Sequence, residues 1–531
     1  MTKKSDKVKN SLSNGFIGGT LSLTLSAVIV KLIGLVYKIP LASILGDEGM
    51  GYFNSAYTVF AFFYLLCTAG VPKAVMILIS EAKAKGQKLE EGKIIKVAIT
   101  MFMTLGGVIT LLFIVFSAPL ASLIGSTKSY ATMIAIAPSI LFVSLSGVIR
   151  GYLSANMKLF DIAVSQIIEG LGKLSVGLVF AMVARRLNLA LEIISALTIL
   201  GVTLGAFFGL LYLLVCSKIK ISKETLGQND KKVRKGHIAR RLLSISIPIT
   251  ISAAIMSVTN LIDLALIIRS LIEKGYSESM ANALYGNYTT LSVPMLNLAT
   301  AVITPISVAY LPIFTRCCIS SDRESLLKTQ RSAIELISVM GAPMMIGLIV
   351  FSKEILTLLF PRSQTEIGAI LLCLAAPSIL FSSLLLIVNT LLEANGRVKA
   401  PLISMIVGSI VKIIISYYLI TKTDMGISGA PIGTTLSYAA ALFVSIIIYT
   451  VSFKRHIPLF TASILPYFNA ALSVMLSRLV FIWLSGRVTE GLALILSVML
   501  AALIYLIISV INGVLAPRKI IEVAKYTKLS T

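Results

Sequence analysis

Ionisable side chains are scarce in this chain of 531 residues. Asp, Glu, Lys and Arg together make up 13% of it, whereas hydrophobic residues make up 57%. A soluble domain carries about a quarter charged residues, so this composition excludes an ordinary soluble protein. Many apolar runs are about 20 residues long, enough for a helix to cross a bilayer. We therefore predict an all-α polytopic membrane protein with about fourteen transmembrane helices.

Metal-ligating and catalytic patterns are also rare. The chain has two histidines and five cysteines, with no CxxC pair and no HExxH motif. We expect no metal site and no cofactor, while coupling to the membrane potential or to a monovalent cation stays open. The segment GLGKLS resembles a phosphate loop but has leucine where Ser or Thr is required. Polytopic glycan ligases and polymerases need large outer loops with catalytic groups, and the predicted outer loops are short. We expect a secondary-type transporter, not an enzyme.

Acidic residues are half as frequent as basic ones, 23 against 47, which gives a net charge of +24. In a soluble protein this excess would suggest nucleic acid as a partner. Here the basic residues concentrate in alternate loops between the apolar runs, as expected for cytoplasmic loops. We therefore predict a multi-pass protein of the bacterial cell membrane with both termini in the cytoplasm, and no nucleic-acid partner.

One stretch of sequence occurs twice. APSILF lies at 137–142 and at 376–381, and the alignment continues without a gap over 137–180, where fourteen of 44 positions are identical at an offset of 239. We infer two pseudo-symmetric six-helix lobes with the same membrane orientation, related by an axis along the membrane normal, plus two extra C-terminal helices. The predicted division is 1–217 for the N-lobe with helices 1–6, 218–242 for a basic cytoplasmic linker, 243–452 for the C-lobe with helices 7–12, and 453–531 for helices 13–14 and a basic cytoplasmic tail.

Charged side chains inside apolar runs are costly and usually face a wet or protein-lined interior. The duplication aligns Lys173 with Lys412. Lys31 and Lys38 lie two turns apart on one helical face, although Lys38 could instead snorkel to the interface. Glu169 and Lys173 have the i,i+4 spacing of a local ion pair. Because lysines outnumber carboxylates, these residues favour an anionic ligand such as a pyrophosphate.

Two sets of candidate site residues follow from these positions. The candidate ligand-binding cations are Lys31, Lys38, Lys173 and Lys412. The candidate cavity polar or ion-coupling groups are Tyr37, Asn54, Glu169, Asn260 and Asp263. Glu335 lies near the predicted inner end of its helix, where an interfacial role is expected.

Three long stretches carry a resemblance to a known family. They are KLIGLVYKIPLASILGDEGMGYFNSAY (31–57), IRGYLSANMKLFDIAVSQIIEGLGK (149–173) and LYGNYTTLSVPMLNLATAVITPISVAYLP (284–312). With them the chain resembles the multidrug/oligosaccharidyl-lipid/polysaccharide (MOP) exporter superfamily. Within it, the chain is similar to the stage V sporulation protein B and YtgP group, which is related to the lipid II flippase MurJ.

The resemblance implies a MATE/MurJ-like bundle of two lobes around a cavity that opens to one side at a time. It implies export of an undecaprenyl-pyrophosphate-linked sugar, a lipid II-like peptidoglycan or polysaccharide precursor, with a groove for the lipid tail at helices 13 and 14. By alignment of KLIGLVYK, Lys31 and Tyr37 fall on arginine positions of the family. Tyr37 and Lys38 replace an expected Arg-Asp pair, and lysine lacks the bidentate fork of arginine.

Two other functions stay open. One is a MATE-type drug/cation antiporter of the same superfamily, and the other is a non-transport scaffold of cell-wall or sporulation machinery. The partners we expect are a lipid-linked oligosaccharide, membrane lipids and cell-wall synthesis proteins, and we expect the chain to be a monomer.

Overall fold

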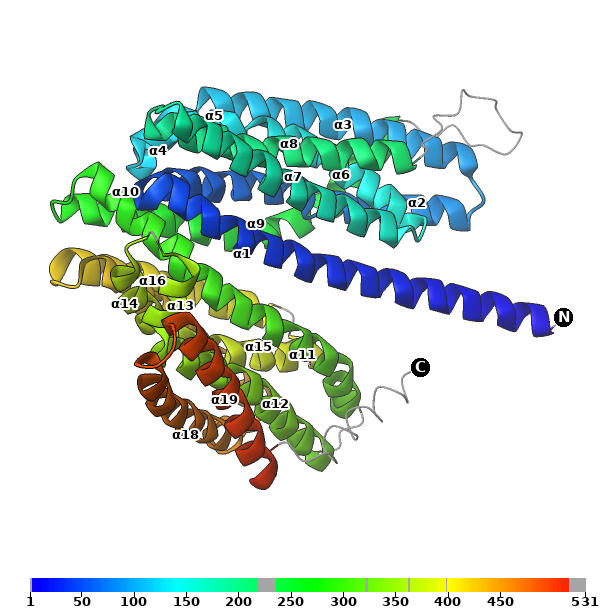
Figure 1. Ribbon diagram of the computed structural model, residues 1–531. Helices are drawn as coiled ribbons and strands as arrows, with labels where there is room; N and C mark the ends of the chain where they lie inside the picture. Colours follow the sequence, from blue (N-terminus) through cyan, green and yellow to red (C-terminus); the bar gives the residue numbers. More distant parts are fainter. Residues whose placement is uncertain (1, 218–234, 320–322, 362, 398, 515–531) are drawn as a thin grey trace. The chain divides into compact units, whose positions relative to one another are not determined.

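The computed structural model describes residues 2–217, 235–319, 323–361, 363–397 and 399–514, which are almost entirely helical (Figure 1). The predicted all-α class is therefore confirmed. Twelve segments in this described part are long and apolar enough to cross a membrane, so the predicted number of fourteen is approximate. The first part of α1 and the whole of α9 are helical but lie outside those twelve. Most of the predicted linker (218–234) and the predicted tail (515–531) lie outside the described residues.

The described helices form two compact units. Unit 1 comprises the chain up to residue 269 together with 277–286, and unit 2 comprises 270–276 together with the chain from residue 287. The division falls after residue 269, within α9, whereas the predicted C-lobe begins at residue 243, earlier in the same helix. The units are defined by which helices pack together, whereas the lobes are defined by the duplication in the sequence. The lobe boundaries therefore stay a prediction.

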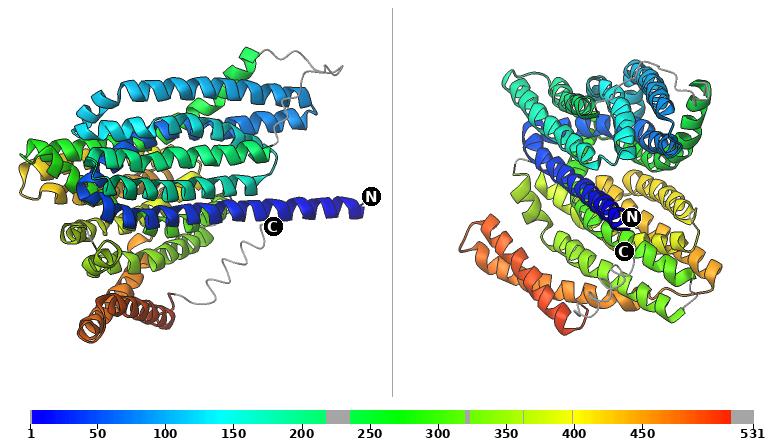
Figure 2. Two further views of the ribbon diagram at one scale, coloured as in Figure 1. Left: turned by 45° about the horizontal axis from the view of Figure 1, so that its top comes forward. Right: turned by 90° about the vertical axis from the view of Figure 1, so that its right-hand side faces the viewer.

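Unit 1 contains most of the N-terminal half of the chain, and its long helices run side by side in both views of Figure 2. Its elements are α1 (Thr2–Thr68), α2 (Val71–Ala84), α3 (Lys88–Val115), α4 (Ser117–Ile124), η1 (Thr127–Ser129), α5 (Tyr130–Ile136), α6 (Pro138–Ala155), α7 (Leu159–Arg186), α8 (Leu191–Ser217), α9 (Lys235–Glu273) and α10 (Glu278–Asn287).

Unit 2 contains the remaining helices, including the pair α18 and α19, which pack against each other. Its elements are η2 (Tyr288–Ser292), which is a π-helix, α11 (Val293–Ile319), α12 (Arg323–Val350), α13 (Ser352–Leu359), α14 (Thr365–Ala375), α15 (Ser378–Ala394), α16 (Ala400–Lys422), η3 (Gly426–Ser428), α17 (Gly429–Phe453), α18 (Leu459–Ser485) and α19 (Glu490–Ile511).

The order of helices is repeated between the units. The run from α3 to α8 and the run from α12 to α17 each contain a long helix, an eight-residue helix, a short helix, a helix that begins at the duplicated APSILF, and two more long helices. This repetition confirms the pseudo-symmetric plan of the fold. Helices α18 and α19 follow the second run, as the two extra C-terminal helices predicted from the sequence.

The duplicated APSILF forms the same break in both runs. Pro138 begins α6, and its equivalent Pro377 caps α15. Proline cannot donate a backbone hydrogen bond, so a carbonyl of the preceding turn loses its partner. In unit 1 the Thr203 hydroxyl donates to the carbonyl of Ala135 at 2.8 Å. In unit 2 the carbonyl of Leu374, the equivalent of Ala135 at the offset of 239, accepts from the Thr435 hydroxyl at 3.3 Å.

Each unit has its own buried apolar core. In unit 1 a cluster joins α2, α3, α6 and α9, with Val75, Phe102 and Leu242 among its members. In unit 2 a larger cluster joins α11, α12, α15 and α17 around Tyr310 and Tyr449. Of the helices in the unit 1 cluster, α6 carries a charged residue of the candidate site.

Candidate functional site

Helix α7 carries most of the candidate site, and glycines hold it against α8. A Cβ added at Gly205 of α8 would lie 2.5 Å from the carbonyl oxygen of Glu169, and one at Gly201 would lie 2.6 Å from Cα of Gly177. The two helices therefore meet backbone to backbone, which only glycine permits. The side chains of Glu169 and Lys173 are left to face α6 and α1.

Lys173 points into the aromatic side chains of α1. Its Nζ lies 4.4 Å from the ring centroid of Tyr57 and 5.5 Å from that of Tyr37, within the range of cation–π attraction. Gly46, with φ 66°, breaks α1 between these tyrosines in a conformation that glycine adopts without strain. No ion pair in the described part of the chain includes Lys173. Among the described residues, therefore, no carboxylate forms an ion pair with the Lys173 ammonium.

Lys38 adjoins this site in unit 1. It is half-buried, and the charges of Lys38 and Lys173 lie close enough to repel each other. Lys31 lies two turns earlier in α1, and its side chain falls outside the described part of the structure. The structure thus brings together two of the four predicted cations.

An arginine that the sequence reasoning missed completes this region. Arg150 of α6 donates from Nη2 to Oε2 of Glu169 at 2.8 Å, and the two side chains are 11% and 26% exposed. Arg150 also interacts with the Tyr64 hydroxyl of α1. Its buried Nε has no hydrogen-bond partner. Glu169 therefore pairs with Arg150 and not with Lys173, its expected i,i+4 partner.

The other polar candidates of unit 1 lie on α1 and α9. Tyr37 is buried and its hydroxyl has no hydrogen-bond partner. Asn54 is also buried, whereas Asn260 is exposed and Asp263 is half-buried. Their roles as cavity or ion-coupling groups stay predictions. Within the described residues, no group of three or more His, Cys, Asp or Glu side chains is placed to hold a metal ion.

Lys412 belongs to unit 2. It is half-buried in α16 and has polar interactions of its own. It occupies the place in the second run of helices that Lys173 occupies in the first, at the offset of 239 residues. Its role in ligand binding therefore rests on this equivalence and stays a prediction.

An apolar groove of about 320 Å³ lies within unit 2, between α11, α12, α13, α18 and α19. Met295, Pro343, Phe351, Val474 and Ala501 are among the residues that line it. The groove therefore presents apolar side chains from five helices.

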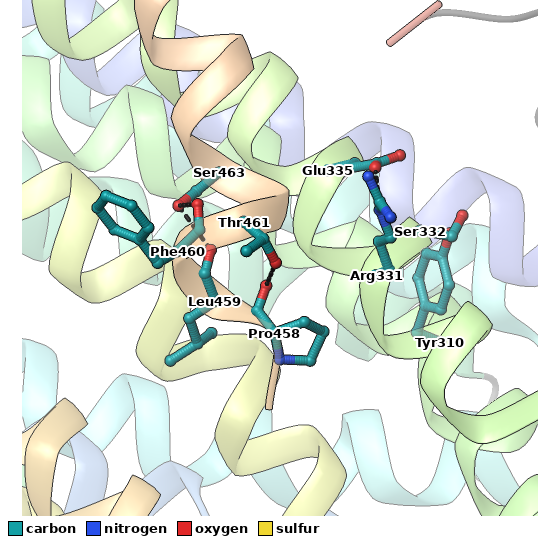
Figure 3. A network of polar contacts seen from close by, with 9 residues as sticks. All are labelled: Tyr310, Arg331, Ser332, Glu335, Pro458, Leu459, Phe460, Thr461 and Ser463. Atoms are coloured by element: carbon teal, nitrogen blue, oxygen red, sulfur yellow. Dashed lines mark hydrogen bonds and ion pairs between the residues drawn. The ribbon is translucent and has the colours of Figure 1, made fainter. Parts of the chain in front are cut away.

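Two arginine–glutamate ion pairs of unit 2 differ in whether they join two helices or lie within one. Arg478 of α18 donates to Glu354 of α13 at 2.6 Å, and its guanidinium lies over the ring of Phe481. Glu335 pairs with Arg331, one turn earlier on α12, at 2.9 Å (Figure 3). The first pair joins two helices and the second stays within one, and the interfacial role of Glu335 stays a prediction.

The fold defines a class of protein before any sequence relative is considered. The chain is similar to the inward closed conformation of the lipid II flippase MurJ, with a TM-score of 0.69 and 17% identity over 92% of this chain and 98% of that one. It is also similar to the inward-facing conformation of a multidrug resistance MATE family transporter of the MOP superfamily, with a TM-score of 0.63 and 14% identity over 82% of this chain and 98% of that one. The chain therefore has the MATE/MurJ-like fold of membrane transporters.

Sequence comparison identifies the family. The family described as Polysaccharide biosynthesis protein matches residues 16–318, more than half of the chain, and the chain belongs to it. The MatE family matches residues 288–418. Stage V sporulation protein B of Bacillus subtilis (strain 168) is 25% identical over 421 residues, which cover 78% of this chain and 80% of that protein. Lipid II flippase MurJ of the same organism is 23% identical over 466 residues, 84% of each chain. The resemblance to the MOP superfamily is confirmed.

Proposed function

We propose that the protein is a flippase that exports an undecaprenyl-pyrophosphate-linked sugar from the inner to the outer leaflet by alternating access. The sugar is a lipid II-like peptidoglycan precursor or a polysaccharide precursor. The name of one relative, Lipid II flippase MurJ, supports this substrate class, and that of another, Stage V sporulation protein B, supports a role in sporulation.

The observation that carries the proposal is the positive charge of Lys173 inside a helical bundle of unit 1. A charge at membrane depth is costly, and such residues are functional by default. Lys173 has aromatic neighbours and no carboxylate partner in the described part of the chain. A pyrophosphate would supply the missing negative charge. Lys31 and Lys38 would add to this attraction in unit 1, and Lys412 would attract an anion at the equivalent place of unit 2, with lysine acting as a point charge.

The groove of unit 2 supports the apolar part of such a substrate. An isoprenoid chain is apolar along its length, and the groove offers it van der Waals contacts in place of those with lipid tails. The groove is lined by α18 and α19, the helices that correspond to the tail groove implied by the family resemblance. A positively charged site and an apolar groove together suit a ligand with a charged head and a long tail.

Transport by the reconstituted full chain tests the proposal. Vesicles would contain a fluorescent undecaprenyl-pyrophosphate-linked sugar, and a membrane-impermeant reductant would bleach the label on the outer leaflet. We expect the protected half of the label to become accessible only in vesicles with the protein. A fluorescent phosphatidylcholine, as the control, should stay protected. Protection of the lipid-linked sugar in vesicles that contain folded protein would overturn the proposal.

The match of residues 288–418 to the MatE family favours one alternative, a drug/cation antiporter. The same vesicles, loaded with a cationic dye and given a sodium or proton gradient, separate the two. We expect no gradient-driven dye movement, because Lys38 and Lys173 would repel a cationic drug. Dye transport without movement of the lipid-linked sugar would establish the antiporter instead, and movement of neither would favour the scaffold.

A further inference from the structure

The ion pair between Arg150 and Glu169 is absent from the second copy of the duplicated segment. At the offset of 239, Asn389 stands in place of Arg150 and Gly408 in place of Glu169. Asn389 accepts a hydrogen bond from Ser445 at 2.8 Å, so that the polar group is satisfied without a charge. The same order of helices therefore forms with or without the ion pair, and the fold does not explain its presence.

Arg150 has hydrogen-bonding capacity that Glu169 does not use. The carboxylate accepts from Nη2, while the buried Nε has no partner. Guanidinium groups bind phosphate through two parallel N–H donors. Since Arg150 is 11% exposed and Glu169 is 26% exposed, the carboxylate is the more accessible partner and the one that a ligand would meet first.

Glu169 lies one helical turn from a second positive charge. Lys173 is four residues further along α7, so both side chains project from one face of the helix. The cation lies over the Tyr57 ring and not against the carboxylate. Glu169 therefore lies close to two cations and is bonded to Arg150.

We propose that Arg150 binds the phosphate groups of the substrate and that Glu169 is its exchangeable counter-ion. This inference rests on the function proposed above and names a binding residue and a competitor at the same site. In the empty site Glu169 balances Arg150, because a buried charge without a partner is costly. A pyrophosphate displaces the Glu169 carboxylate from Arg150 and accepts hydrogen bonds from both Arg150 and Lys173. The return of Glu169 to Arg150 then favours release of the ligand.

Binding to the purified full chain in lipid nanodiscs tests this exchange, with titration calorimetry as the readout. The probes are farnesyl pyrophosphate and inorganic pyrophosphate, with farnesol as the control that lacks phosphate. A head-group site binds both pyrophosphates, whereas a site that needs the lipid-linked form binds farnesyl pyrophosphate alone. Either result supports an anion site, and farnesol should bind no better to wild type than to variants.

The decisive variant is Glu169→Gln, which keeps the size of the side chain and removes the competing charge. We expect the pyrophosphate probe to bind about tenfold tighter, since hydrogen bonds between charged groups contribute about 1.5–3 kcal/mol and 1.4 kcal/mol is tenfold. Arg150→Gln should weaken binding by about tenfold or more. Arg150→Lys keeps the charge and loses the forked pair of N–H donors. Its affinity for the probe should lie between those of the wild type and Arg150→Gln. Glu354→Gln is the matched control, because Glu354 also pairs with an arginine of another helix, and it should leave binding unchanged.

A purely structural ion pair predicts the opposite outcome. Glu169→Gln would then bind the probe more weakly or equally, with a lower unfolding temperature, and that result overturns the proposal. Failure of folded wild-type protein to bind either pyrophosphate also overturns it. The vesicle assay above stays independent. Transport with no effect of Glu169→Gln on affinity refutes only the exchange, and pyrophosphate binding without transport refutes only the flippase function.

Discussion

The two copies of the duplicated segment keep their lysine but differ in the side chains around it. Lys173 of α7 has an ion pair beside it, formed with α6, and lies over aromatic rings of α1. Lys412 of α16 occupies the equivalent position in unit 2, where the two places of that ion pair hold Asn389 and Gly408. One unit thus concentrates charge where the other has neutral groups, which is why we assign the main anion contacts to unit 1.

The packing of the following helix shows how the difference arose without loss of the fold. In unit 1 the glycine is on α8, where a Cβ at Gly205 would lie 2.5 Å from the Glu169 carbonyl oxygen. In unit 2 the glycine is on α16, where a Cβ at Gly408 would lie 2.8 Å from the Ser437 carbonyl oxygen. Small residues let helix backbones approach closely, and the residue of α8 that packs against position 169 is a glycine. Glycine on α8 therefore leaves position 169 open to a glutamate.

The largest expected effect separates the two lysines. Lys173→Ala should lower the transport rate about tenfold or more, because loss of a charged hydrogen-bond donor costs about 1.5–3 kcal/mol. Lys412→Ala should cause a loss several times smaller, since no arginine stands at the position of unit 2 that is equivalent to Arg150. The measurement is the vesicle assay with the lipid-linked sugar, and Lys173→Arg is the control that keeps the charge. Equal losses at the two lysines would refute the asymmetry between the units.

The next effect concerns stability at the two helix crossings. Gly205→Ala and Gly408→Ala should each cost about 1–3 kcal/mol, because the added methyl group meets backbone atoms. The matched control is Gly107→Ala in α3, where a Cβ would meet nothing within 4 Å and helix propensity improves by up to about 1 kcal/mol. Thermal unfolding in detergent measures all three. Only Gly205→Ala should also weaken pyrophosphate binding, since it displaces α7. A stable Gly205→Ala variant would contradict the backbone contact.

Much of the fold follows from the sequence because the membrane makes its signals strong. Apolar runs of helical length predicted the helices, and the duplicated APSILF predicted the repeat, whereas the break that its proline makes in each copy was not predicted. The kink at Gly46 and the division within α9 depend on packing between distant segments, so that no local pattern predicts them. The boundaries of the predicted lobes come from the duplicated sequence, and the packing of the helices does not test them.

The candidate site was predicted less well than the fold. Local spacing paired Glu169 with Lys173, but the carboxylate bonds Arg150 on the preceding helix. A local rule sees only one helix, and the competing partner lies 19 residues away. One signal could have found it: Arg150 and Glu169 both differ from their counterparts in the second copy, at positions that would face each other. When two opposite charges are present in one copy of a repeat and both are absent from the other, the two residues are expected to form an ion pair.

The smallest expected effect concerns a feature that both units share, a threonine hydroxyl that donates to a carbonyl beside the proline of APSILF. Thr203 donates to the Ala135 carbonyl at 2.8 Å, and Thr435 donates to the Leu374 carbonyl at 3.3 Å, each three residues before the proline of APSILF. Replacement of either threonine by valine keeps the shape and removes the donor. Because hydrogen bonds between membrane helices contribute about 0.6 kcal/mol on average, we expect both variants to lose about that much, with Thr203→Val losing more since its bond is shorter. Thermal unfolding measures the loss, and serine at the same positions should restore it. A loss in one unit alone would show that the repeated break is held differently in the two copies.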